Sequence, residues 1–190
     1  MTAHPPAYTS ASPSWLALVS AALAMMAVVA ASNLLVQYPF TPLGLEQVLT
    51  WGAFTYPISF LVTDLTNRQA GPVMARRVVY VGFALGVLLS AVVSEPRIAA
   101  ASGTAFLVGQ LLDITVFNRL RRASWWKAPF AASALGSMVD TALFFSLAFA
   151  GTDVPWLSLG AGDLCVKLLY AVLLLAPFRI AMAWWRPVAA

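Results

Sequence analysis

The sequence predicts an all-α integral membrane protein with six transmembrane helices and with both termini in the cytoplasm. Three observations predict this fold class. Hydrophobic residues make up 61% of the chain and charged residues only 9%, whereas soluble domains are about 45–50% apolar and about 25% charged. Six apolar segments each approach the length of about 20 residues that a helix needs to cross a bilayer. Basic residues, finally, concentrate on one side of these segments.

The first span is predicted over about residues 15–36, with Asn33 and Gln37 on one face near its far end. It lacks the positively charged start of a signal peptide, and its apolar run is longer than that of a usual signal sequence, so we expect a retained helix. Residues 1–13 before it are polar and rich in proline, and we expect a disordered cytoplasmic tail. Residues 14–186 should form one six-helix transmembrane domain.

The second span is predicted over about residues 47–64. Pro57 lies inside it and predicts a kink or a broken helix. Asp64 and Arg68 stand four residues apart, so on a helix they share a face and are close enough to pair. The Gly-Pro sequence at positions 71 and 72 should end this helix, because proline cannot continue the hydrogen-bond ladder.

Four more spans are predicted, over about residues 78–93, 98–117, 129–150 and 156–178. The first of these carries no charge but has a stripe of small residues at a spacing of four, comprising Gly82, Gly86, Ser90 and Ser94. The stripe predicts close helix packing, which could serve either the interior of the protein or a homodimer. Each of the other three spans contains an aspartate, namely Asp113, Asp140 and Asp163.

The distribution of basic residues predicts the direction of the chain. Nine of them lie on one side of the predicted spans, and the opposite side has only Arg97. The nine are Arg68, Arg76, Arg77, Arg119, Arg121, Arg122, Lys127, Arg179 and Arg186. By the positive-inside rule that side is the cytoplasm, which places both termini there. All seven tryptophans lie within a few residues of a predicted span end, as an interfacial aromatic belt requires.

The scarcity of histidine and cysteine excludes several kinds of site. The one histidine, His4, lies in the N-terminal tail, which removes bis-histidine haem ligation, histidine metal clusters and a Ser-His nucleophile in the membrane. The one cysteine, Cys165, excludes an internal disulfide. We therefore expect neither an enzyme nor a metal or other cofactor. The net charge of +4 marks topology in the lipid bilayer rather than a nucleic-acid partner.

Charged and polar residues within the spans are the functional candidates, because one charge at mid-bilayer costs at least about 2.5–3.5 kcal/mol. The predicted direction places Gln110, Asp140 and Lys167 near mid-depth, Asp64, Arg68, Asp113 and Arg119 toward the cytoplasmic ends, and Asn33, Gln37 and Asp163 toward the outer ends. Asp163 and Lys167 are i,i+4 neighbours, so they form either a plain ion pair or part of a site. Asp140 has no basic residue on its own helix and needs another partner, a proton or water.

A weak internal echo points to the cytoplasmic mouth of the bundle. The second and fourth spans both end in an aspartate that is followed by an Asn-Arg pair, at residues 64–68 and 113–119. Both spans run in the same direction, so the echo is of a parallel repeat. The candidates for gating or ion coupling are Asp64, Arg68, Asp113, Asn118, Arg119 and Asp163.

Six stretches of the chain form a specific set of motifs in this order. They are SNLLVQ (32–37), LTWGAFTYPISFLVTDLTNR (49–68), ARRVV (75–79), GQLLDITVFNRLR (109–121), SMVDTALFF (137–145) and DLCVK (163–167). Together they resemble the queuosine precursor transporter family of bacterial inner membranes, which is similar to the vitamin uptake transporters. Thr115 departs from the pattern because some members have a histidine there, so no relay is expected through that position.

The resemblance implies a solitary six-helix importer of 7-deazaguanine bases, the cyano- and aminomethyl-substituted precursors of the tRNA base queuosine. It also implies a distant similarity in shape to the substrate-binding subunits of vitamin importers. A carboxylate suits the N–H groups of such a base, an amide or ammonium suits its carbonyl, and aromatic faces, including that of Phe144, suit its ring. The candidate substrate-binding residues are Asp140, Gln110, Lys167, Asn33, Trp51, Tyr56 and Phe60.

Two alternatives stay open at this point. In the first, the chain is a vitamin- or nucleobase-binding subunit of an ATP-driven importer, and uptake requires a separate energising module. In the second, it is a membrane scaffold protein whose polar residues only pair helices. The second alternative predicts that neutral substitutions at Asp140 or Gln110 change stability without any effect on transport.

Overall fold

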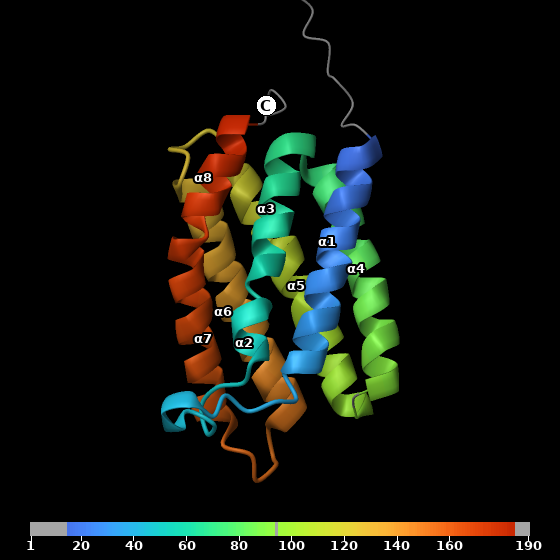
Figure 1. Cartoon of the computed structure of the whole chain (residues 1–190), viewed down its shortest axis with the longest axis vertical. Coiled ribbons are helices and arrows are strands. Elements are labelled where there is room, and N and C mark those ends of the chain that lie inside the picture. Colours follow the sequence, from blue (N-terminus) through green and yellow to red (C-terminus); the bar gives the residue numbers. More distant parts are fainter. Residues whose placement is uncertain (1–14, 94, 185–190) are drawn as a thin grey trace, which may run out of the picture.

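The computed structural model describes residues 15–93 and 95–184, which form a bundle of roughly parallel and antiparallel helices (Figure 1). The helices are α1 (Trp15–Leu35), α2 (Gly52–Thr55), α3 (Ile58–Ala70), α4 (Pro72–Val93), α5 (Pro96–Leu120), α6 (Lys127–Phe149), α7 (Trp156–Leu173) and α8 (Leu175–Trp184). The predicted all-α class is confirmed. The predicted disordered tail at residues 1–13 lies outside the described residues.

Within the described ranges, five helical segments are long and apolar enough to cross a membrane. They are Trp15–Leu35, Pro72–Leu89, Pro96–Leu120, Lys127–Phe149 and Trp156–Trp184, the last combining α7 and α8. These segments coincide with the first, third, fourth, fifth and sixth predicted spans. The second predicted span contains two helices, α2 and α3, each too short to cross a membrane alone.

The break in the second span lies at Pro57, as the sequence predicts. α2 has only four residues, and the tertiary amide of Pro57 starts a new helix, α3. α3 continues to Ala70, six residues beyond the predicted end of the membrane span at Asp64. Its polar last turns stay helical because they pack against α5, where Asn67 is fully buried and donates to the Ile114 carbonyl at 3.3 Å.

Gly71 alone connects α3 to α4. Its φ of 82° lies in the left-handed region that glycine adopts without strain, and Pro72 then starts the next helix. The predicted end of the helix at this Gly-Pro sequence is confirmed. The predicted connection from there to the third span at residue 78 is wrong. α4 already starts at Pro72, six residues earlier, and its first turns include Arg76 and Arg77.

α4 packs closely on α1 through its small residues. A Cβ atom at Gly82 would collide with Met25, and one at Gly86 would lie 3.0 Å from Val29 Cγ1. Met25 and Val29 belong to a buried apolar cluster that α1, α4 and α5 share. The prediction of close packing is therefore confirmed for Gly82 and Gly86, and inside the chain. The side chains of residues 90 and 94 are outside the described part.

α5 and α6 make the most intimate contact in the bundle. A Cβ atom at Gly109 would lie 2.9 Å from Asp140 Cβ, and one at Gly136 would lie 3.3 Å from Asp113 Cβ. The same Cβ positions would lie 3.2 Å from the Gly136 carbonyl oxygen and 3.0 Å from the Gly109 carbonyl oxygen, respectively. Each aspartate follows the glycine of its own helix by four residues and packs on the glycine of the other helix. Asp113 and Asp140 therefore lie on either side of one crossing of two antiparallel helices. We call this contact the glycine crossing.

We predict that Gly136→Ala destabilises the protein by about 1–3 kcal/mol, the usual cost of overpacking. The added methyl group would lie 2.8 Å from Phe60 Cε1 and 3.0 Å from the Gly109 carbonyl oxygen, and a backbone atom cannot move aside. Thermal unfolding in detergent measures the change. Gly160→Ala is the matched control, because its methyl group would meet Phe145 at an ordinary 3.4 Å. Equal melting temperatures for the two variants would contradict close packing at the crossing.

Candidate functional site

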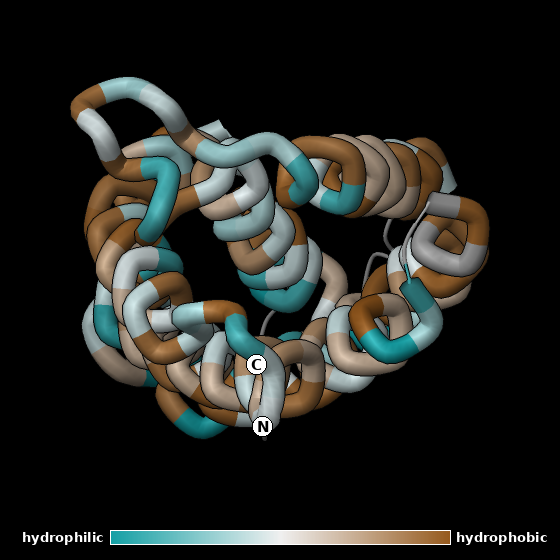
Figure 2. The backbone as a smooth tube through the Cα atoms, turned by 90° about the horizontal axis from the view of Figure 1, so that it is seen from below, coloured by the Kyte–Doolittle hydropathy of each residue, from teal (hydrophilic) through white to brown (hydrophobic). Residues whose placement is uncertain are grey.

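One end of the bundle holds a cavity of about 380 Å³. Its walls come from the C-terminal end of α1, the start of α2, and parts of α5, α6 and α7, and Figure 2 looks onto this end. The polar lining residues include Ser32, Asn33, Gln37, Thr50, Tyr56, Ser102, Asp140, Asp163 and Lys167, and the aromatic wall consists of Phe144, Phe145 and Phe149. The connection from α1 to α2 also borders it, since Gly162 lets the Val48 carbonyl approach α7 closely.

Lys167 of α7 is the centre of a buried polar network on the cavity wall. Its Nζ atom lies 2.5 Å from Asp163 Oδ2 and 2.7 Å from Asp140 Oδ2, and it donates to Thr141 Oγ1 at 3.0 Å. An ammonium group has three protons, so these contacts use all of them. The predicted Asp163–Lys167 pair is confirmed. Asp140 finds on a different helix the basic partner that its own helix lacks.

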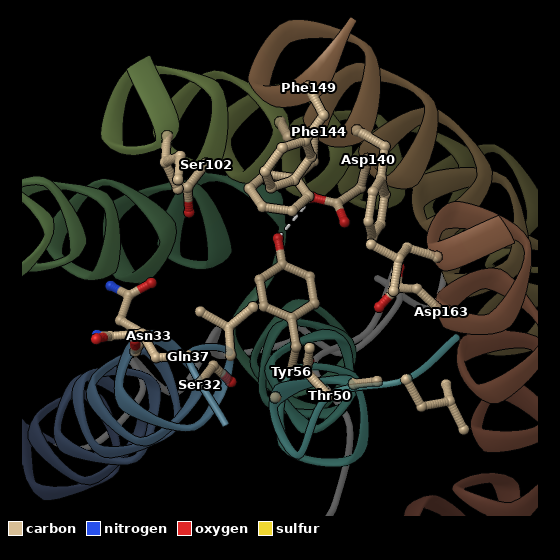
Figure 3. A pocket seen from close by; sticks show the side chains of 18 of the residues that line it. Ser32, Asn33, Gln37, Thr50, Tyr56, Ser102, Asp140, Phe144, Phe149 and Asp163 are labelled. Carbon is tan, nitrogen blue, oxygen red and sulfur yellow. Dashed lines mark hydrogen bonds between the residues drawn. The ribbon is translucent and has the colours of Figure 1, made fainter. Parts of the chain in front are cut away.

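Tyr56 completes the network from the broken second span. Its hydroxyl donates to Asp140 Oδ1 at 2.6 Å (Figure 3), and its ring lies 4.8 Å from the Lys167 ammonium, a cation–π distance. Tyr56 directly precedes Pro57, between α2 and α3. The break in the helix therefore puts this side chain on the cavity wall, and both carboxylate oxygens of Asp140 are occupied.

Asp163 keeps one oxygen free toward the cavity. Oδ2 accepts from Lys167 and from Thr141, the latter at 2.8 Å, whereas Oδ1 makes no hydrogen bond or ion pair in the described part of the chain. The side chain is 14% exposed. Asn33 and Gln37 lie across the cavity from it (Figure 3). Two carboxylates around one ammonium leave an excess of acceptors here, so this wall suits a ligand that donates hydrogen bonds.

Three of the candidate substrate-binding residues do not line the cavity. Gln110 is fully buried behind it, where it accepts from Thr63 at 2.5 Å and donates to Ser59 at 2.9 Å. Phe60 is buried beside the glycine crossing. Trp51 is 41% exposed and contacts the ring of Phe40 instead. The structure thus brings together Asn33, Tyr56, Asp140 and Lys167 of the predicted set, with Asp163 from the predicted gating set.

The predicted Asp64–Arg68 ion pair is wrong. Arg68 Nη1 donates instead to the backbone carbonyl of Arg121 at 3.0 Å, near the end of α5, where carbonyls lack helical partners. Arg121 in turn donates to the backbone and side-chain oxygens of Asn67. Asp64 points into the bundle and accepts from Ser133 at 3.1 Å. The contacts of the two arginines lie at the end of the bundle opposite the cavity mouth. We call Asn67, Arg68 and Arg121 the inner clasp.

The echo between the second and fourth spans does not extend to the surroundings of its residues. Asn67 is fully buried in the inner clasp, whereas its counterpart Asn118 and the following Arg119 are exposed. Arg121, and not the Arg119 of the echo, contacts Asn67 at this end of the bundle. Burial lowers the pKa of the Arg121 guanidinium, and the neighbouring positive charge of Arg68 lowers it further.

Sequence reasoning missed Thr141 and Arg121 as members of these clusters. Thr141 directly follows Asp140, and a hydroxyl beside an intramembrane carboxylate was the available signal. The sequence identifies Arg121 only as one of the basic residues that mark the topology, because no spacing in the sequence relates it to Asn67. Its contact joins residues 54 positions apart.

Comparisons with known proteins agree with this architecture. The family described as "Putative vitamin uptake transporter" matches residues 50–95 and 89–182. A "Queuosine precursor transporter" of Escherichia coli is 37% identical over 176 residues, and a "Probable queuosine precursor transporter" of Haemophilus influenzae is 38% identical over 186, with 79% of each chain covered in both cases. A protein of Bacillus subtilis with the latter description is 30% identical over 164 residues, with 70% of each chain covered. No solved structure matches significantly.

The match covers the broken second span, the glycine crossing and the helices that carry the lysine network. The relatives are transporters and not enzymes, and the helices of this chain are those of a multi-pass membrane protein. The chain therefore belongs to the queuosine precursor transporter family.

Proposed function

We propose that this protein imports a queuosine precursor, a 7-deazaguanine base such as 7-cyano-7-deazaguanine, across the bacterial inner membrane. The observation that carries the proposal is the buried Asp140–Lys167–Asp163 network on the wall of a cavity that Phe144, Phe145 and Phe149 also line. Ionisable residues within spans generally mark substrate or ion pathways. The cavity volume falls within the range of about 300–1,000 Å³ that is usual for small-molecule sites.

The free oxygen of Asp163 is the proposed acceptor for the N–H groups of the base. Lys167 has no proton left for a ligand, so its role is to hold the two carboxylates in place. The donor to the base carbonyl then comes from the amide of Asn33 or Gln37 across the cavity. Phe144 and its aromatic neighbours offer ring faces for stacking.

Asp140, Tyr56 and Gln110 act in this proposal as supports of the binding wall. Asp140 positions both Lys167 and Tyr56 through its two oxygens. Gln110 ties α5 to α3 behind the cavity and keeps the broken span in register. A substrate site that rests on fixed groups of this kind pays less ordering entropy when it binds.

We further propose six membrane crossings with both termini in the cytoplasm, where α2 and α3 together form the second crossing. The cavity then opens to the outside, and the inner clasp closes the cytoplasmic end. Release of substrate into the cytoplasm requires the Arg68–Arg121 and Arg121–Asn67 contacts to break. Asn118 and Arg119 are exposed beside this exit, where they can meet the leaving base.

We predict that the chain, as the only added component, restores queuosine in the tRNA of a bacterium that can neither make nor import the precursors. The cells are fed 7-cyano-7-deazaguanine, and queuosine is measured by mass spectrometry of tRNA nucleosides. Restoration only together with an ATP-driven module would favour a binding subunit of an importer. Absence of any restoration in cells that express the protein well would leave a scaffold.

We predict that Asp163→Asn and Asp140→Asn each weaken binding of the base at least tenfold, or by about 1.4 kcal/mol. The first substitution removes the charge of the proposed acceptor, and the second releases Tyr56 and Lys167 from their positions. Calorimetry in detergent measures the affinities. Asp153→Asn is the control, because Asp153 is exposed in the connection from α6 to α7 and does not line the cavity. Near-normal affinity in both variants would place the substrate elsewhere.

We predict that a reporter fused after Ala190 lies in the cytoplasm, and that one inserted at Thr152 lies outside. The basis is the nine-to-one distribution of basic residues between the two sides. A pair of reporters with opposite compartment requirements measures each position. The reverse result would turn the cavity mouth toward the cytoplasm and make the inner clasp an outer one.

A further inference from the structure

A second acidic site lies on the far side of the glycine crossing from the cavity. It consists of Asp64 on α3 and Asp113 on α5, which are 2% and 0% exposed. Both face the same turn of α6, because Asp64 accepts from Ser133 and Asp113 packs on Gly136, three residues further along that helix. Neither of them lines the cavity.

The hydrogen bonds of this pair are incomplete. Asp64 Oδ2 accepts from the Ser133 hydroxyl on α6 at 3.1 Å. The other three oxygens, Asp64 Oδ1 and both of Asp113, have no hydrogen-bond partner in the described part of the chain. Buried polar atoms are almost always paired, so three unpartnered carboxyl oxygens in one place point to a ligand.

No cation among the described residues forms an ion pair with either carboxyl group. The other ionisable residues on the helices α3 to α8 are Arg68, Arg76, Arg77, Tyr80, Arg97, Arg119, Lys127, Asp140, Asp163, Cys165, Lys167, Tyr170 and Arg179. Within the described residues, the only ion pairs are those of Lys167 with Asp140 and Asp163. Arg68, one turn after Asp64 on α3, and Arg121 donate instead to carbonyl and amide oxygens of the inner clasp.

Two unshielded negative charges cannot persist in such a place. Two like charges in a buried site repel strongly because little water screens them, and each also loses its hydration. A single proton removes one charge and supplies a donor from one carboxyl group to the other. A sodium ion would need a shell of several oxygens and room for it, whereas Gly136 packs directly on Asp113.

We propose that Asp64 and Asp113 form a proton-binding site that takes up one proton with each substrate and releases it at the cytoplasmic side. This inference rests on the proposed transport function and adds its coupling ion. Release occurs when the inner clasp opens, because Asn67 follows Asp64 by less than one turn of α3 and its movement admits water to the pair.

The glycine crossing supplies the connection between the two sites. Asp113 packs on Gly136, and Asp140, which holds the network at the cavity, packs on Gly109. A ligand that shifts Asp140 or the segment around it must therefore shift the α5–α6 contact that shapes the Asp64–Asp113 pair. The backbone carbonyls at the crossing leave no free space that could absorb such a shift.

The test uses the full chain in liposomes with labelled 7-cyano-7-deazaguanine. An inside-alkaline gradient of one pH unit should drive accumulation up to about tenfold in the wild type, since a tenfold proton ratio supplies about 1.4 kcal/mol. In Asp113→Asn and Asp64→Asn the accumulation ratio should fall to about one, while exchange of labelled for unlabelled base continues. Asp153→Asn should accumulate like the wild type. Accumulation by Asp113→Asn equal to that of the wild type would overturn the inference.

Failure of the inference and failure of the proposed function give different results. Exchange without any effect of the pH gradient would leave the transporter standing and remove the proton, and accumulation along a sodium gradient would assign sodium instead. Infrared spectroscopy tests the site without transport. The carbonyl-stretch band of a protonated carboxyl group should be present in the wild type and in Asp153→Asn, and absent in Asp113→Asn. A wild type without this band would also overturn the inference.

Discussion

The close approach of α5 and α6 at Gly109 and Gly136 is the constraint on which the rest of the structure depends. Neither position has room for a side chain, and each glycine faces the backbone of the other helix. The crossing therefore sets the distance between two carboxyl groups, Asp113 and Asp140, that lie on its two sides. In a bilayer, where lipid is as apolar as a helix surface, such small-residue contacts are what hold helices together. One contact thus serves both packing and the placement of charge.

Lys167 explains how a cluster of charges inside the helical bundle is tolerated. Burial of a charge in the membrane is costly unless it is paired and hydrogen-bonded, and Lys167 meets that condition with two carboxylates and a hydroxyl. The network joins α6 to α7 and, through Tyr56, to the break between α2 and α3. Tyr56 lies in this break, and a helix that continued without interruption through Pro57 would orient the Tyr56 side chain differently. The broken helix is thus part of the cavity wall rather than a defect in a span.

The two ends of the bundle differ in kind. The end with the cavity is lined by polar and aromatic side chains that face an open volume. The opposite end is closed by the inner clasp, in which arginines donate to backbone carbonyls and to an amide oxygen rather than to carboxylates. When such a contact opens, the acceptor left behind is neutral, whereas opening a buried ion pair would leave a carboxylate unpaired. Such asymmetry is what alternating access requires of a transporter.

The sequence by itself determined whatever depends on neighbours along the chain. Hydropathy determined the all-α membrane class, Pro57 the break, Gly71 the end of α3, and the i,i+4 spacing the Asp163–Lys167 pair. Tertiary structure alone decided the partners between helices. The sequence shows that Asp140 needs a cation but not which helix supplies it. Likewise, only the structure shows that Arg68 donates to the Arg121 carbonyl instead of pairing with Asp64. Spacing along one helix follows from its geometry, whereas contacts between helices depend on their rotation and on where small residues let them approach.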